Sequence, residues 1–191
     1  MIRTSVRRIF RTAVPLFLIW IGPTTAAAQP PADHRADIVH NLCKFVVWPK
    51  SAFSGDGDGL DIHLVGPGDA NRDLTSLAGR RVRGRVIRVS RPADVAGTPP
   101  DAQVLVIDRE SRDRVDEVLS DLEGRPVLTI SELPGFSARG GMIELVSTDD
   151  RVRFHINLAA ARASGLIIQS PLLQIAHVLE RLPAPSEART Q

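Results

Sequence analysis

The chain has 191 residues, of which 24 are lysine or arginine and 22 are aspartate or glutamate, for a formal net charge of +2. Residues 1–28 hold four of the arginines and no acid, so the rest of the chain has 20 basic against 22 acidic side chains, a net charge of −2. The basic character thus belongs to the first segment and does not support a nucleic-acid partner. The other 163 residues (191 minus 28) suffice for one domain with a hydrophobic core.

Residues 1–28 have the pattern of a signal peptide. Four arginines precede an apolar run at residues 13–21, and Ala26-Ala27-Ala28 offers a small-residue cleavage site before Gln29. The apolar run is shorter than the about 20 residues that span a bilayer, so cleavage fits better than the alternative, an uncleaved anchor. We therefore expect an exported protein whose mature part begins near Gln29.

Cys43 is the only cysteine. An intramolecular disulfide is therefore impossible, even in an oxidising compartment. Because Cys43 lies among apolar residues on a predicted helix, we expect a buried thiol, and intermolecular pairing is the alternative.

The first element of the mature part is a predicted helix over residues 33–47. Its apolar residues recur at helical spacing, and Trp48-Pro49 ends it because a residue before proline is pushed out of the α region. Trp48 is either a core aromatic residue or a surface anchor. A flexible loop rich in Asp and Gly (residues 54–59) follows, but it lacks the ligand pattern of a calcium-binding EF-hand.

A buried strand is predicted at Leu60 to Val65, followed by a tight turn at Gly66-Pro67-Gly68 and a helix over residues 69–78. The turn lacks the third glycine and the later acid of a dinucleotide-binding motif. A cluster of arginines then surrounds four β-branched residues: Arg80, Arg81, Arg83, Arg85, Arg88 and Arg91. The cluster is interpreted as the charged edge strand of a sheet, and a patch for an acidic partner is the alternative.

The second half of the chain alternates apolar strands with helices. Strands are predicted at residues 103–107 and 126–130, with a helix between them that buries Val115, Val118, Leu119 and Leu122 and stops at Gly124. Residues 142–147 and 151–158 form a predicted hairpin, and Asn157 caps a short helix that stops at Gly165. A last helix starts at Ser170-Pro171, buries Leu172, Ile175, Ala176 and Leu179, and ends at Pro183.

This order of elements predicts a single-domain α/β sandwich. Its central sheet is mostly parallel with helices on both faces, and a C-terminal β-hairpin is followed by two helices. The boundaries we expect are a signal peptide at residues 1–28, the α/β domain at 29–182 and a disordered tail at 183–191.

No catalytic, cofactor-binding or metal-binding residues are predicted. The five histidines are scattered without a metal-ligand spacing, and Gly135 to Arg139 lacks the closing glycine of a nucleophile elbow. Glu144 and His155 would face each other across the hairpin, which is too little for a catalytic site, and His155 is interpreted as solvated. We therefore expect that the protein is not an enzyme.

Short motifs from residue 41 to residue 176 occur in an order and spacing that is specific as a set. They include the first-helix segment NLCKFVVWP, the LVG and LTIS segments, the GF, GGMI and VRFHINL segments of the hairpin region, and the closing GL and LLQIA segments. Together they resemble the YfiR-like family of periplasmic proteins, catalogued as a domain of unknown function, over about residues 33–180. The family-signature residues of structural type are Asn41, Lys44, Phe45, Trp48, Pro49, Gly140, Gly141, Phe154 and Asn157.

The resemblance implies a regulator in the periplasm. The best-known member of the family represses an inner-membrane diguanylate cyclase by binding its periplasmic part, and an outer-membrane lipoprotein relieves the repression. The implied partners are thus such a cyclase, such a lipoprotein and a second copy of the chain, in a pathway that links cyclic di-GMP to biofilm formation. The family's redox control through cysteine pairs cannot apply, because Cys43 stands alone.

Two surfaces are candidates for the partner interface: the glycine-flanked loop with Phe136 and Arg139, and the arginine edge with Arg83 and Arg85. Phe136 could instead fill the core. The alternative function is a periplasmic small-molecule sensor, with a pocket at the carboxyl ends of the parallel strands. A hydrolase without known relatives is a third, disfavoured hypothesis.

Overall fold

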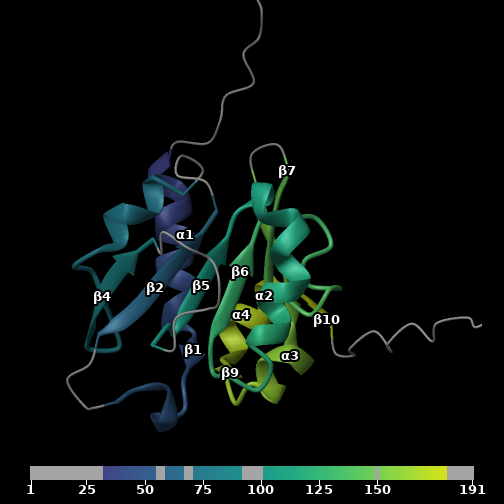
Figure 1. Cartoon of the computed structure of the whole chain (residues 1–191). Helices are drawn as coiled ribbons and strands as arrows, with labels where there is room; N and C mark the ends of the chain where they lie inside the picture. The colour runs from purple at the N-terminus through teal and green to yellow at the C-terminus, as the bar shows by residue number, and fades with distance from the viewer. Residues whose placement is uncertain (1–31, 55–58, 67–70, 92–100, 149–150, 180–191) are drawn as a thin grey trace, which may run out of the picture.

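The computed structural model describes residues 32–54, 59–66, 71–91, 101–148 and 151–179. The predicted signal peptide, most of the Asp/Gly loop, part of the Gly66 turn and the predicted tail lie outside these residues. Within them, an eight-stranded sheet has the strand order β10-β8-β7-β6-β5-β2-β4-β3 (Figure 1). The helical elements are α1 (Ala32–Lys44), α2 (Val115–Asp121), α3 (Leu158–Ala163), α4 (Ser170–Ile175) and the 3-10 helices η1 (Lys50–Ala52), η2 (Asp73–Leu77) and η3 (Arg109–Arg114).

The centre of the sheet is parallel, as predicted. Strands β4 (Arg85–Ser90), β2 (Leu60–Val65), β5 (Val104–Ile107), β6 (Leu128–Ser131) and β7 (Ile143–Thr148) run in one direction. Every residue of β5 and β6 is buried. This burial explains the continuous apolar sequence of β5, whereas β6 alternates apolar residues with the buried Thr129 and Ser131. β8 (Arg151–Asn157) pairs antiparallel with β7, and the short β3 (Arg81–Val82) pairs antiparallel with β4 at the other end.

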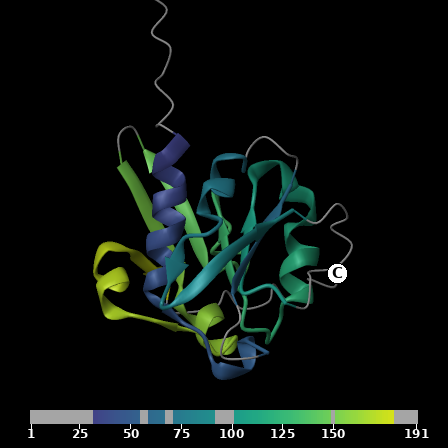
Figure 2. The same cartoon turned by 90° about the vertical axis from the view of Figure 1, so that its left-hand side faces the viewer.

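Helices lie on both sides of this sheet (Figure 2). Ala36, Val39 and Leu42 of α1 belong to the larger core, together with the apolar side chains of one sheet face. Val115 and Val118 of α2 belong to a second core on the other side. Cys43 is fully buried in the larger core, and burial raises the pKa of its thiol to about 12, so the prediction of a buried thiol is confirmed.

The first two predicted helices are shorter in the structure than the sequence predicts. α1 stops at Lys44 rather than Val47, and Val46–Val47 forms β1, which pairs antiparallel with β9 (Ile167–Ile168). The two valines gain backbone partners that lie about 120 residues further along the chain, and a helix would not provide them. The helix predicted over residues 69–78 is the 3-10 helix η2 in its described part.

The last helix is also corrected. α4 ends at Ile175, and residues His177–Leu179 form β10, which pairs in parallel with β8. Pairing with β10 gives hydrogen-bond partners to the backbone N–H and C=O groups at the edge of β8. The helical spacing of the apolar residues did not reveal this pairing. Ile175, predicted to be in the core, is 67% exposed.

Candidate functional site

The most distinctive surface feature is an apolar groove beside the β3–β4 edge, which we call the Trp48 groove. It has a volume of about 180 Å³. Its lining residues come from β1, the segment after it, β2 and the β3–β4 hairpin: Val47, Trp48, Lys50, Phe53, Leu60, Val82, Arg83 and Arg85. These residues combine an apolar floor with three cations, and none of them is acidic.

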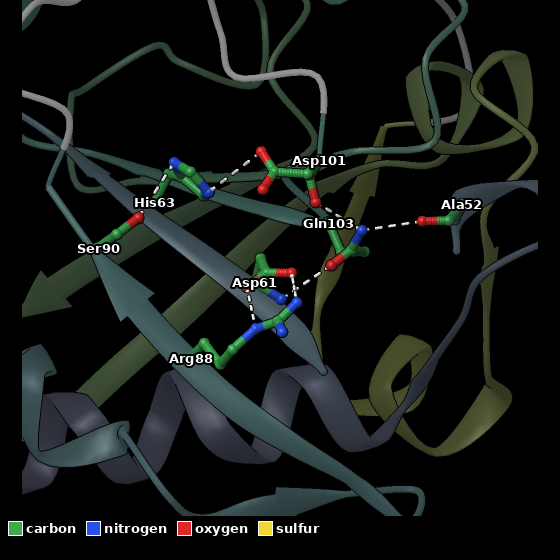
Figure 3. Close-up of polar contacts among 7 residues, drawn as sticks. All are labelled: Ala52, Asp61, His63, Arg88, Ser90, Asp101 and Gln103. Carbon is green, nitrogen blue, oxygen red and sulfur yellow. Dashed lines mark hydrogen bonds and ion pairs between the residues drawn. The ribbon is translucent and has the colours of Figure 1, made fainter. Parts of the chain in front are cut away.

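A single buried side chain, Gln103, holds one wall of the groove in place. Its Nε2 donates to the carbonyl oxygen of Ala52 at 2.8 Å, and its Oε1 accepts from the backbone N–H of Asp61 at 2.8 Å (Figure 3). The indole N–H of Trp48 donates to the backbone oxygen of Gln103 at 3.0 Å. The segment Trp48 to Phe53 is thus fastened to the starts of β2 and β5, so the groove is preformed.

The arginines of the rim are held by two local features. The guanidinium of Arg85 stacks on the ring of Phe53, 3.6 Å from its centroid, a cation–π contact. Arg83 lies in the two-residue turn between β3 and β4 with φ of 51°, and it is the only non-glycine residue with positive φ in the described part of the chain. Such turns normally carry Asn, Asp or Gly, because a residue with a full side chain is strained there.

Two neighbouring arginines are engaged in ion pairs. Arg88 binds both carboxylate oxygens of Asp61, at 2.6 and 2.5 Å (Figure 3). Arg80 binds Asp37 at 2.6 Å. Within the arginine cluster, Arg80 and Arg88 thus bind carboxylates of the same chain, and Arg83 and Arg85 line the Trp48 groove.

Next to the Asp61–Arg88 pair, His63 lies between a hydroxyl and a carboxylate. Its Nδ1 shares a hydrogen bond with Ser90 Oγ at 3.3 Å, and its Nε2 lies 3.9 Å from Asp101 Oδ1 (Figure 3). Burial lowers the pKa of His63, while Asp101 and Asp61 partly oppose this effect. A catalytic triad needs a hydrogen bond that orients the histidine, and 3.9 Å is too long for one. Among the described residues, no group of three or more His, Cys, Asp or Glu could hold a metal ion.

The two halves of the predicted interface lie in different surroundings. Phe136 is fully buried in the core beneath α2, which corrects its prediction as an interface residue and agrees with the alternative that it fills the core. A Cβ on Gly141 would collide with the Phe136 ring, so a glycine is required there. Arg139 is exposed, but it binds Asp116 of α2 with atom separations of 2.9 and 2.8 Å.

Glu144 organises the loop that contains Phe136. Its buried carboxylate accepts from the backbone N–H groups of Gly135 and Ser137 at 3.0 and 3.1 Å and from the Ser137 hydroxyl at 2.7 Å. Burial alone would raise the pKa of Glu144, but these hydrogen bonds and His155 together lower it. His155 faces Glu144 across the β7–β8 pair, with its Nδ1 3.8 Å from the carboxylate. His155 is partly buried rather than fully solvated.

The family model of the YfiR/HmsC-like proteins matches residues 32–177, more than half of the chain. The chain belongs to the YfiR/HmsC-like family. This is a family of periplasmic regulators, and its members act with a membrane diguanylate cyclase. No helix in the described part of the chain is both long and apolar enough to cross a membrane.

The residues that carry the YfiR/HmsC-like pattern hold the fold together. Asn41 accepts from Lys44 Nζ at 3.0 Å, and the Phe45 carbonyl accepts from Gln169 N at 2.9 Å next to the β1–β9 pair. Pro49 begins η1, and Phe154 packs against the larger core. Asn157 caps α3 through Ala160 N and also donates to the Ser137 carbonyl, while Gly140 has φ of 102°.

Sequence reasoning did not identify Phe53 and Gln103 as parts of the site. Phe53 stood in no periodic segment, and Gln103 was included only as the first residue of an apolar strand. The one available signal for Gln103 was its position, since a polar residue directly before a continuous apolar strand must find partners when it is buried.

Proposed function

We propose that this protein is a periplasmic regulatory protein that represses an inner-membrane diguanylate cyclase by binding its periplasmic part. The observation that carries the proposal is the family match over residues 32–177. A preformed surface lowers the cost of ordering side chains on binding, and the Trp48 groove is the best candidate for such a surface.

The groove supports this role through its chemistry. Aromatic and arginine side chains dominate the binding energy of many protein interfaces, and here Trp48, Phe53, Arg83 and Arg85 meet around one groove. Its cations would favour a partner segment with acidic residues. Ile167 pairs with Val47 of the groove across β1 and β9 and is 63% exposed, so it would extend the apolar contact area.

The test is a comparison of cyclic di-GMP in cells with and without the gene. Deletion should raise the cyclic di-GMP level, and biofilm formation should increase with it. An unchanged level in cells that keep their membrane cyclases would contradict the proposal.

The role of the groove is tested with complementing variants. Arg83→Glu should leave the deletion uncomplemented at normal protein abundance, because it reverses a charge at the rim. Arg153→Glu is the matched control, since Arg153 is an exposed arginine on β8, near the opposite end of the sheet. If Arg83→Glu complements as well as Arg153→Glu does, the partner binds elsewhere.

A further inference from the structure

A second, larger hollow lies on the other side of the molecule, between α2 and α3, and we call it the α2–α3 pocket. Its volume is about 490 Å³, within the range of about 300–1,000 Å³ that is common for small-molecule sites. The apolar residues of its lining are Leu119 of α2, Leu122 just after α2, Met142 just before β7, and Ala160 and Ala163 of α3. It lies near the amino ends of β6 and β7, not at the carboxyl ends of the parallel strands.

The lining of this pocket carries one more acidic than basic side chain. Asp116 and Glu123 line it, and Arg139 is the only cation among its lining residues. Arg139 donates to Asp116 through Nε and Nη2 and to the Arg112 carbonyl at 3.4 Å, and it also feels the charge of Asp113. Its charge is therefore already balanced by the protein, and an anionic ligand would have to compete with Asp116 for it.

The negative charge of Glu123 favours the binding of a cation in this pocket. Glu123 lies just past the end of α2, whose last turn contains no basic residue. The carboxyl end of a helix carries a partial negative charge, and the Glu123 carboxylate adds to it. An apolar hollow with this surplus of negative charge matches a molecule with a hydrocarbon body and a positively charged end.

We propose that the α2–α3 pocket binds a small organic cation of the alkylamine class, with its hydrocarbon chain against Leu119, Ala160 and Ala163 and its ammonium group near Glu123. Two features support this orientation. The hydrocarbon chain would cover Leu119, Ala160 and Ala163, whose side chains are still partly exposed to solvent in the hollow. The ammonium group would remain at the mouth, where Glu123 is exposed and water can complete its hydration.

The pocket is separate from the Trp48 groove. It involves β6, β7, α2 and α3, whereas the groove involves β1, β2, β3 and β4. Ligand binding here therefore does not depend on the proposed repression of a cyclase, and failure of one proposal would leave the other standing.

The experiment measures binding of three probes of equal chain length to the purified full-length chain by isothermal titration calorimetry. Hexylamine should bind more tightly than 1-hexanol, and hexanoate should bind most weakly, because the three probes differ only in the charge of one end. Glu123→Gln should weaken hexylamine binding about three-fold, the scale of an exposed charge pair, and leave 1-hexanol unchanged.

Two further variants make the result specific to the pocket. Ala163→Phe fills the hollow from an exposed position of α3, so it should remove binding of all three probes while the circular dichroism spectrum stays native. Glu117→Gln removes a neighbouring exposed charge of α2 that does not line the pocket, so it should leave hexylamine binding unchanged. The proposal is overturned if hexylamine does not bind, if it binds no better than 1-hexanol, or if Glu117→Gln weakens it as much as Glu123→Gln does.

Discussion

The arginine edge and the Phe136 loop differ in what they do with similar residues. Each brings phenylalanine, arginine and glycine together, but at the edge Phe53 comes from the segment after η1 and only Arg83 and Gly84 form the turn between strands. At the edge, Arg85 covers Phe53 at the surface, and Arg83 is held in a strained turn. In the loop, Phe136 is fully buried, and the buried carboxylate of Glu144 binds the surrounding backbone N–H groups.

The difference shows what a buried acid does to a loop. Phe136 can turn inward because Glu144 accepts the hydrogen bonds of Gly135 and Ser137, whose N–H groups would otherwise be unsatisfied beneath α2. At the edge, the β3–β4 turn is supported by strand pairing and by an exposed hydrogen bond from Arg81 Nη1 to the Gly84 carbonyl at 3.0 Å. The loop is therefore a structural element, and the edge is a surface suited to binding.

The largest effect is expected from removing the buried ring. Phe136→Ala should lower the free energy of unfolding by about 3–5 kcal/mol, because it leaves a cavity in the core beneath α2. Phe53→Ala, at the half-buried ring of the groove, should cost less than half as much. Urea denaturation followed by circular dichroism measures both values. Equal losses would contradict the distinction between the two regions.

The next effect concerns the acid that holds the loop. Glu144→Gln should cost about 1–3 kcal/mol, because an amide cannot accept all three hydrogen bonds. The folded-state pKa of Glu144 is lowered, so its stabilising contribution is present above the ordinary value of 4.5 and is lost as the pH falls below it. The free energy of unfolding, measured by denaturation at several values between pH 6 and pH 3, should therefore fall less steeply with decreasing pH for the variant than for the unchanged protein. An unchanged slope would argue against this role of Glu144.

A smaller effect of opposite sign is expected at the edge. Arg83→Asn should raise the free energy of unfolding by about 1 kcal/mol, because asparagine tolerates the left-handed conformation that strains arginine. The same variant should repress cyclic di-GMP less well, since the rim of the Trp48 groove loses a cation. Arg85→Asn is the control, and it should bring no gain in stability. A variant that is more stable and still fully active would show that Arg83 is dispensable for binding.

The smallest effect is expected from His63, next to the edge. Its folded-state pKa is lowered below 6.5, so the unfolded chain binds a proton more readily. The contribution of His63 to the free energy of unfolding is therefore highest above pH 6.5 and declines as the pH falls below that value. His63→Gln should reduce the decline between pH 7 and pH 5, measured by thermal denaturation. The contribution of His63 changes below pH 6.5 and that of Glu144 only below pH 4.5, so the two contributions can be separated.

The sequence by itself determined the centre of the fold. Short segments rich in apolar residues predicted the parallel strands β2, β5 and β6, and the continuous apolar sequence of β5 is typical of a strand covered on both sides. Cys43 was correctly placed in the core, and Asn157 caps α3 as its side chain chemistry suggested. These features depend on local periodicity or on neighbours in sequence, which a single chain displays directly.

Only the tertiary structure decided the features that depend on distant partners. Val46–Val47 and His177–Leu179 became strands because β9 and β8 offer them backbone hydrogen bonds, which outweigh local helical spacing. Phe136 is buried because Glu144 satisfies the loop around it, and the groove exists because Gln103 fastens the segment after Trp48. In each case the deciding energy lies in a contact between residues far apart in the chain or in a buried hydrogen bond. Neither leaves a periodic trace in the sequence.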